Sequence, residues 1–194
     1  MLTLLFKIIR RLKIWVQQLL LSLKVVEYKY LYKERFNIAG SLNAGKGFNI
    51  YFDASKSTLQ IYHQVVFRNG CELRTGQDGA LTIGHHTFFN NYCSVQCFGK
   101  INIGNNCQFG EGVKLYDMNH RFNDPGVLIS EQGYHVGEII IGNNCWVGSN
   151  VTILKNVTIG DNVVIGANCL IYKSVPSNSL VVHNENLVIT NRRD

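Results

Sequence analysis

Between Ile141 and Pro176 the sequence reads IGNNCW, VGSNVT, ILKNVT, IGDNVV, IGANCL and IYKSVP, which is one six-residue pattern repeated without a gap. Every block begins with Ile or Val, four blocks carry Gly in second place, and the fifth place is always Val or Cys. A period of six matches neither an α-helix, with about 3.6 residues per turn, nor an isolated strand, in which every second residue shares a face. It fits a three-sided prism in which the first residue of each block points inward. We therefore predict a left-handed parallel β-helix, a mainly β solenoid of stacked coils.

The same pattern extends upstream and is broken once. From Ile83 the blocks are IGHHTF, FNNYCS and VQCFGK, and after Ile101-Asn102 they continue as IGNNCQ, FGEGVK and LYDMNH. Residues 121–138 then depart from the repeat, which predicts a loop extruded at a corner, where functional residues commonly lie. Residues 37–82 contain short alternating runs between glycines, and we interpret them as less regular end coils. The predicted β-helix domain therefore covers residues 37–182, and a tail of residues 183–194 follows.

Small residues fit this prism in two ways. The Gly and Asn of each block suit corner turns that need a positive φ. The fifth place takes Cys in four blocks, where we interpret it as a small buried hydrophobe equivalent to Val; these residues are Cys93, Cys107, Cys145 and Cys169. The cysteines do not form two close pairs that could supply a set of metal ligands, so we expect no metal site. Reduced cysteines favour a cytoplasmic location.

The bulk charge excludes one class of partner. The 194 residues carry a formal charge of +6, but only 16% are charged, and the basic residues form no stripe interleaved with aromatics. We therefore expect no nucleic-acid partner.

Residues 1–36 differ from the rest and predict an amphipathic helix, because apolar residues recur three and four apart; they are Leu5, Ile8, Leu12, Trp15, Leu19, Leu23 and Val26. The uncharged run 14–22 is shorter than the roughly 20 residues that cross a bilayer, and basic residues interrupt a signal-peptide pattern. Two interpretations stay open. The helix packs on the solenoid or a neighbouring copy, or residues 1–26 lie on an anionic membrane surface at the inner face of the membrane. In the second case the headgroups would meet Lys7, Arg10, Arg11 and Lys13.

The run LYDMNHRFNDPG, the excursion and the block run from Ile141 together resemble the hexapeptide-repeat acyltransferases, and within them the galactoside, maltose and capsular-polysaccharide O-acetyltransferase branch. The resemblance covers residues 83–182. It implies a homotrimer with its site between two chains, acetyl-coenzyme A as donor, and a hydroxyl of a sugar or cell-surface polysaccharide unit as acceptor. The chain departs from the family at residues 182–186, which read VHNEN where a Gly-Asn-Pro-Ala-Lys-like tail is common.

The resemblance also assigns the reacting residues. His120, just before the loop, matches the family's catalytic His, and an imidazole ordinarily exchanges its proton near neutral pH. As general base it would take the proton of the attacking hydroxyl. Asp117 and Glu138 are the acids nearest to it in sequence and are candidates to orient it. Asn91, in the coil before, matches an Asn that positions the acceptor, while its position also suits an ordinary corner turn. His135, inside the loop, is the next candidate base.

Coenzyme A needs a groove for its arm and cations for its phosphates. Trp146, just after the loop, matches the family's Trp beside the cofactor. Gly148 and Ala167 are small where a chain must pass close, and Lys155 and Lys173 are candidates for the phosphates.

Other readings of the same repeat fit less well. A γ-type carbonic anhydrase needs a second His five residues after the first, and position 125 is Pro. A serine acyltransferase usually carries a larger helical N-terminal domain, and an amino-sugar N-acyltransferase would acetylate an amine instead of a hydroxyl. A non-catalytic scaffold or ice-binding solenoid predicts a regular Thr-rich face and no loop. We expect hydroxyl transfer and keep these classes as alternatives.

Overall fold

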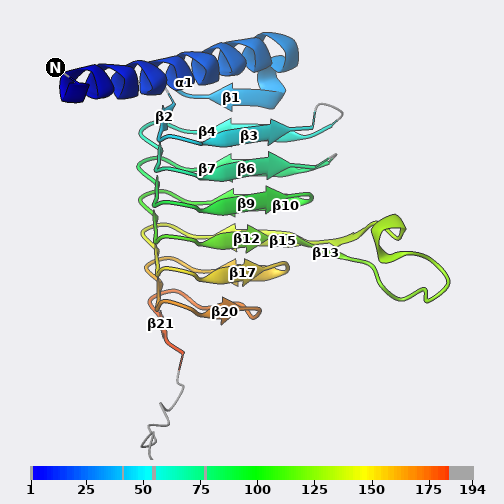
Figure 1. Ribbon diagram of the computed structural model, residues 1–194. Helices are drawn as coiled ribbons and strands as arrows, with labels where there is room; N and C mark the ends of the chain where they lie inside the picture. The colour runs from blue at the N-terminus through cyan, green and yellow to red at the C-terminus, as the bar shows by residue number, and fades with distance from the viewer. Residues whose placement is uncertain (1, 41, 54–55, 77, 184–194) are drawn as a thin grey trace, which may run out of the picture.

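The computed structural model describes residues 2–40, 42–53, 56–76 and 78–183. Most of the predicted tail, residues 184–194, lies outside these ranges. The chain opens with helix α1 (Leu2–Tyr32) and the short 3-10 helix η1 (Lys33–Arg35), and then winds into a stack of coils (Figure 1). The first strand begins at Phe36, the last residue that the sequence assigned to the helical segment.

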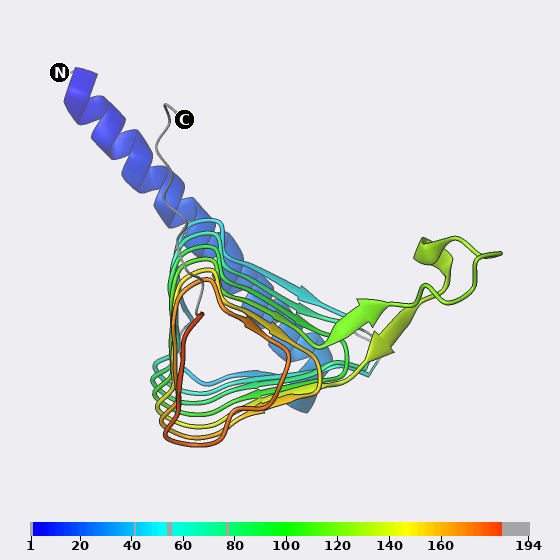
Figure 2. The ribbon, with the colours of Figure 1, turned by 90° about the horizontal axis from the view of Figure 1, so that it is seen from below.

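Three parallel sheets form the sides of a triangular prism (Figure 2). Sheet A contains β1 (Phe36–Ile38), β4 (Thr58–Ile61), β7 (Ala80–Ile83), β10 (Lys100–Ile103), β15 (Glu138–Ile141) and β18 (Val157–Ile159). Sheet B contains β2 (Asn43–Ala44), β5 (Val66–Phe67), β8 (Phe88–Phe89), β11 (Gln108–Phe109), β16 (Trp146–Val147), β19 (Val164–Ile165) and β21 (Leu180–Val181). Sheet C contains β3 (Asn49–Phe52), β6 (Glu72–Thr75), β9 (Ser94–Cys97), β12 (Lys114–Tyr116), β17 (Thr152–Leu154) and β20 (Leu170–Ile171).

The path of the chain gives the coil its hand. In Figure 2 the prism is seen from its C-terminal end, and the chain runs clockwise from sheet A through sheet B to sheet C while it advances toward the viewer. A clockwise path that approaches the viewer is left-handed, so the predicted left-handed parallel β-helix is confirmed.

The interior is filled by the residues that the repeat predicts. Each block from Ile141 buries its first residue, with at most 4% of the surface exposed at any of these six positions. In sheet B the earlier coils place aromatic rings there, and Phe67, Phe89 and Phe109 stack with centroids 4.8 and 4.5 Å apart. The four predicted fifth-place cysteines are buried as well. Each inward side chain therefore rests on its counterpart in the next coil.

The corners correct one part of the sequence interpretation. Asn residues do carry the positive φ, for example 54° at Asn144 and 57° at Asn162. The second-place glycines do not. At Gly142 a Cβ would lie 2.5 Å from Asp161 Oδ1 and 2.7 Å from the backbone of Gly160 in the next coil. Glycine is needed there because adjacent coils approach too closely for any side chain.

Coils differ in length at one corner, between sheets C and A. Leu59 pairs with Leu81, 22 residues later, whereas Ile139 pairs with Val157, only 18 residues later. The predicted excursion leaves at this corner as an antiparallel hairpin of β13 (Met118–His120) and β14 (Tyr134–Val136), with η2 (Ile129–Glu131) in its tip (Figure 1). The hairpin begins before residue 121, and Glu138 already belongs to sheet A. The earlier coils have the same three-sided path with longer turns at this corner.

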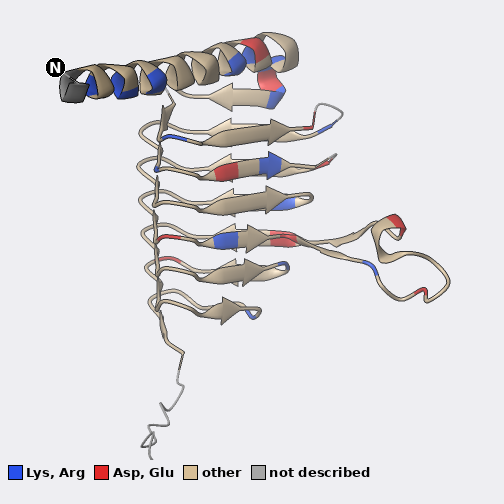
Figure 3. Cartoon of the chain, in the orientation of Figure 1, with Lys and Arg blue, Asp and Glu red and all other residues tan. Residues whose placement is uncertain are grey.

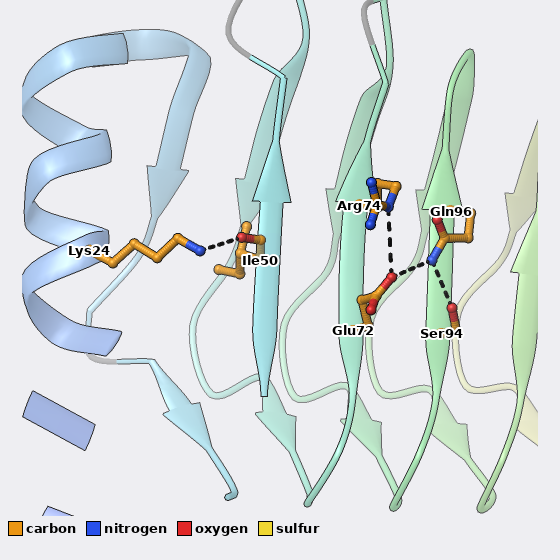
Figure 4. A network of polar contacts seen from close by, with 6 residues as sticks. All are labelled: Lys24, Ile50, Glu72, Arg74, Ser94 and Gln96. Atoms are coloured by element: carbon orange, nitrogen blue, oxygen red, sulfur yellow. Dashed lines mark hydrogen bonds and ion pairs between the residues drawn. The ribbon is translucent and has the colours of Figure 1, made fainter. Parts of the chain in front are cut away.

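Helix α1 lies across the N-terminal end of the prism and covers its open edge (Figures 1 and 2). Its C-terminal half packs on the core through the side chains of Leu21, Val25, Tyr28 and Tyr32. Lys24 donates a hydrogen bond to the carbonyl of Ile50 at 2.8 Å (Figure 4), and Lys29 donates one to the carbonyl of Ile38 at 2.5 Å. No helix among the described residues is long and apolar enough to cross a membrane.

We expect Gly142→Ala to lower the free energy of unfolding by about 1–3 kcal/mol, because its Cβ overpacks against the backbone of the next coil. The control is Gly126→Ala in the hairpin, where the nearest atom to the new Cβ is Asp124 Oδ1 at 3.3 Å. Urea unfolding followed by circular dichroism measures both. Equal stabilities of the two variants would contradict close packing at the corner.

Candidate active site

Asp117 holds closed the corner from which the hairpin leaves. It follows β12 and is fully buried. Its two carboxylate oxygens accept hydrogen bonds from the backbone N–H groups of Phe98 and Gly99, at 2.8 and 2.9 Å, and its carbonyl accepts one from Gly137 at 2.7 Å. Burial raises the pKa of Asp117, and the two backbone N–H groups offset part of that rise. Asp117 therefore fastens both strands of the hairpin to the preceding coil.

His120 lies at the outer end of β13 and is exposed. It pairs across the hairpin with Tyr134, and the two rings have centroids 4.6 Å apart. The acids predicted to orient it are engaged elsewhere. The carboxylate of Asp117 binds the backbone of the preceding coil, and Glu138 forms an ion pair of 3.9 Å with Lys100 on sheet A. The structure thus brings His120 together with Tyr134.

His135 lies on the other side of the hairpin. It pairs with Asn119, and neighbouring residues on a strand point to opposite faces. His120 and His135 therefore face different surroundings although both are exposed.

A cavity of about 630 Å³ lies beside His120, between the hairpin, sheet C and α1. Aromatic and charged side chains line much of it; they include Tyr28, Tyr51, Phe98, Tyr134, Asp53, Arg74 and Asp78. Arg74 stacks on Tyr51, 4.4 Å from the ring centroid, and lies 3.8 Å from the carboxylate of Glu72 (Figure 4). Tyr134 lines the cavity and its ring also packs against His120, so this one side chain connects the cavity with the candidate base.

The remaining predicted residues fall on two edges of the prism. Asn91, Gly148 and Ala167 lie at the edge between sheets B and C, in corners joined by backbone hydrogen bonds such as Asn168 N–H to Ser149 O at 2.9 Å. Trp146 stands just before this edge on β16, with 59% of its surface exposed. Asn91 Oδ1 accepts a hydrogen bond from the backbone of Asn69 at 3.2 Å, as a corner Asn does.

The two lysines share the edge of the hairpin, between sheets C and A. Lys155 follows β17 and Lys173 follows β20, and these strands are the next two neighbours of β12 in sheet C. The Cβ atom of Lys155 would lie 3.2 Å from a Cβ built on Gly137, at the root of the hairpin. One chain therefore brings His120 and the lysines to one edge and carries Trp146 at another, with sheet C between them.

The residues that line the cavity are not marked by the six-residue repeat. Glu72 and Arg74 occupy outward places of an alternating strand, which is a usable signal for a polar surface. The contact between His120 and Tyr134 joins two strands of a hairpin whose register no repeat reveals. In the described ranges, no group of three His, Cys, Asp or Glu side chains could hold a metal ion.

A family model described as bacterial transferase hexapeptide (six repeats) matches residues 138–173. A probable acetyltransferase of Mycobacterium tuberculosis, Rv3034c, is 25% identical over 154 residues, which cover 79% of this chain and 51% of that protein. The chain spans about half the length, or less, of the curated relatives it matches.

Two solved structures share the architecture. The maltose O-acetyltransferase of Clostridium difficile 630 superposes with a TM-score of 0.52 at 26% identity, over 80% of this chain and 69% of that one. A galactoside acetyltransferase in complex with coenzyme A superposes with a TM-score of 0.50 at 24% identity, over 82% of this chain and 66% of that one, and this match speaks for the fold alone.

Asp117→Asn should lower the free energy of unfolding by about 1–3 kcal/mol, because the amide turns an N–H toward a backbone N–H and leaves buried donors unpaired. Asp78→Asn, an exposed change at the rim of the cavity, is the matched control and should alter stability little. Chemical unfolding of both variants measures the difference. An unchanged free energy of unfolding in Asp117→Asn would show that these hydrogen bonds of Asp117 do not stabilise the fold.

Proposed function

We propose, from the match of residues 138–173 to the hexapeptide transferase family model and from the similarity to acetyltransferases, that this chain is an acetyl-coenzyme A-dependent O-acetyltransferase acting on a sugar hydroxyl. The observation that carries the proposal is the exposed His120 on a hairpin extruded from the repeat, beside a cavity with aromatic walls. The names of Rv3034c and of the maltose O-acetyltransferase support acetyl transfer. Coenzyme A is bound by the solved galactoside acetyltransferase, and we carry it over to this chain as part of the proposal.

His120 supplies the proton chemistry. A sugar hydroxyl is a weak nucleophile, and a general base that takes its proton in the transition state makes it competent. His120 would take this proton as the hydroxyl oxygen bonds to the thioester carbonyl carbon. As the carbon–sulfur bond breaks, the imidazolium would return the proton to the sulfur of coenzyme A. Tyr134 supports the ring by packing against it.

Asp117 acts on this reaction through the backbone. Its carboxylate and carbonyl fix both strands of the hairpin, and the hairpin carries His120. Its role in the proposal is therefore to position the base without touching the reacting groups.

The cavity beside His120 is the proposed acceptor site. Sugars offer apolar ring faces and hydroxyl groups, and the cavity offers aromatic rings together with Arg74, Asp53 and Asp78. Arg74 is already held by Tyr51 and Glu72, so it is pre-oriented as a donor. The acceptor is thus proposed to be a sugar or a polysaccharide unit.

The cofactor groove requires two chains. Trp146, Gly148 and Ala167 lie on one edge, whereas His120, Lys155 and Lys173 lie on another. A strand of sheet C spans roughly 10–15 Å, too far for one chain to present both edges to a thioester. A homotrimer that sets the Trp146 edge of one chain against the His120 edge of the next completes the site. Asn91 would then reach the acceptor from the neighbouring chain.

A cytoplasmic location follows from the donor, because acetyl-coenzyme A is available inside the cell. The six buried free thiols agree with a reducing compartment.

His120→Ala should reduce turnover by about 10²–10⁴-fold, the usual effect of losing a general base. The fold should persist, because His120 is exposed. Release of the coenzyme A thiol from acetyl-coenzyme A is measured with a panel of mono- and oligosaccharides. His135→Ala, on the opposite face of the hairpin, is the control and should keep most of the activity. Retained turnover in His120→Ala would place the base elsewhere, and acetylation of amines alone would contradict hydroxyl transfer.

Mixed assemblies test whether the site lies between chains. Trp146→Ala alone should raise KM for acetyl-coenzyme A more than it lowers turnover, because Trp146 packs beside the cofactor. When Trp146→Ala and His120→Ala chains are co-expressed in equal amounts, about one quarter of the sites in a trimer pair two intact edges. Activity at low acetyl-coenzyme A should therefore exceed that of either variant alone. Light scattering should give the mass of three chains, and no recovery of activity would place both residues in one chain's site.

A further inference from the structure

Helix α1 has a side that is committed to the solenoid. Leu21, Val25, Tyr28 and Tyr32 pack on the core, and Lys24 and Lys29 bind backbone carbonyls of the first coil. A helix turns about 100° per residue, so these residues define one side of it. The N-terminal half continues past the outline of the prism (Figure 2), and residues 5–20 are all exposed.

The opposite side of α1 is its most apolar. Between residues 5 and 26 a sector of about 140°, centred opposite the side that packs on the solenoid, contains apolar side chains alone. They are Leu5, Ile8, Ile9, Leu12, Trp15, Val16, Leu19, Leu20, Leu23 and Val26, with exposed fractions from 39% to 75%. A monomer in water rarely exposes a continuous apolar face of this length, so a partner must cover it.

The charges on α1 distinguish between the candidate partners. Lys7, Arg10, Arg11 and Lys13 precede the first acid of the chain, Glu27 (Figure 3). Arg11 and Lys13 flank the two borders of the apolar sector. A second copy seated in parallel on this face would bring the same cations together, and α1 has no acid before Glu27 to balance them. An anionic lipid surface supplies both an apolar layer and negative headgroups.

We propose that α1 docks on the surface of an anionic lipid bilayer. The helix lies in the plane of the membrane with its apolar sector among the acyl chains, and Trp15 sits near the headgroups, where Trp is enriched. Because α1 crosses the end of the prism, the solenoid stands away from the membrane along its axis (Figure 1). At the inner face of the cell membrane the docked site would meet membrane-attached glycan precursors; this last consequence, unlike the docking, rests on the proposed function.

The test is sedimentation of the full chain with vesicles. We expect it to bind vesicles of phosphatidylcholine with about 30% phosphatidylglycerol, to bind pure phosphatidylcholine at least about tenfold less, and to be released as salt rises. The double variant Leu12→Glu and Leu19→Glu should lose at least about tenfold in binding. The matched control is Leu128→Glu with Leu180→Glu, which changes two leucines that are 68% and 69% exposed on other parts of the chain; it should bind like the unchanged chain.

Three outcomes would overturn the proposal. They are equal binding to neutral and anionic vesicles, equal loss in both double variants, and no binding by the unchanged chain. A smaller mass in solution for the Leu12→Glu and Leu19→Glu variant, measured by light scattering without lipid, would identify a second copy as the partner instead. Circular dichroism and thermal unfolding of each variant show that the solenoid remains folded, and none of these readouts depends on acetyl transfer.

Discussion

Neighbouring coils are hydrogen-bonded strands that lie about 4.8 Å apart, and this spacing governs the whole prism. An inward side chain must touch its counterpart one coil away, which is why Phe67, Phe89 and Phe109 stack as a column. A corner residue must leave room for the next backbone, which is why Gly104 and Gly142 follow each other on one edge. The spacing between coils therefore determines the hydrogen bonding between strands, the packing of the core and the residues that the corners accept.

That distance confines variation to the corners. A residue added inside a strand would turn every following side chain to the other face, whereas a residue added at a corner leaves the register intact. The chain adds residues at the corner between sheets C and A, first as longer turns and then as the hairpin that carries His120. Asp117 makes the largest of these additions compatible with the stack, because it replaces the backbone partners that the departing strand gives up.

The repeat from Ile141 to Pro176 is sufficient to predict the fold, because the place of a residue within its block determines whether it lies in the core or at a corner. The position of the excursion and of His120 followed from where that pattern stops. The sequence names Asp117 as a candidate to orient His120 because the two are close along the chain, but closeness in sequence does not fix the direction of a side chain. Asp117 stands two residues after the inward Leu115, and that alternation places its side chain inward. The cavity could not be predicted, since Tyr51 and Arg74 come from two separate coils and Tyr134 comes from the hairpin.

The edge between sheets C and A also fixes the distances between the side chains along it. Lys155 and Lys173 stand one and two coils beyond the hairpin, so they lie roughly 5 and 10 Å farther along the axis. No single substitution can alter these separations, because they are set by the number of whole coils and not by individual residues. A ligand that spans this edge therefore meets contact sites whose separations are multiples of the coil spacing. A chain of this architecture can adapt to a longer or shorter ligand only by gaining or losing an entire coil.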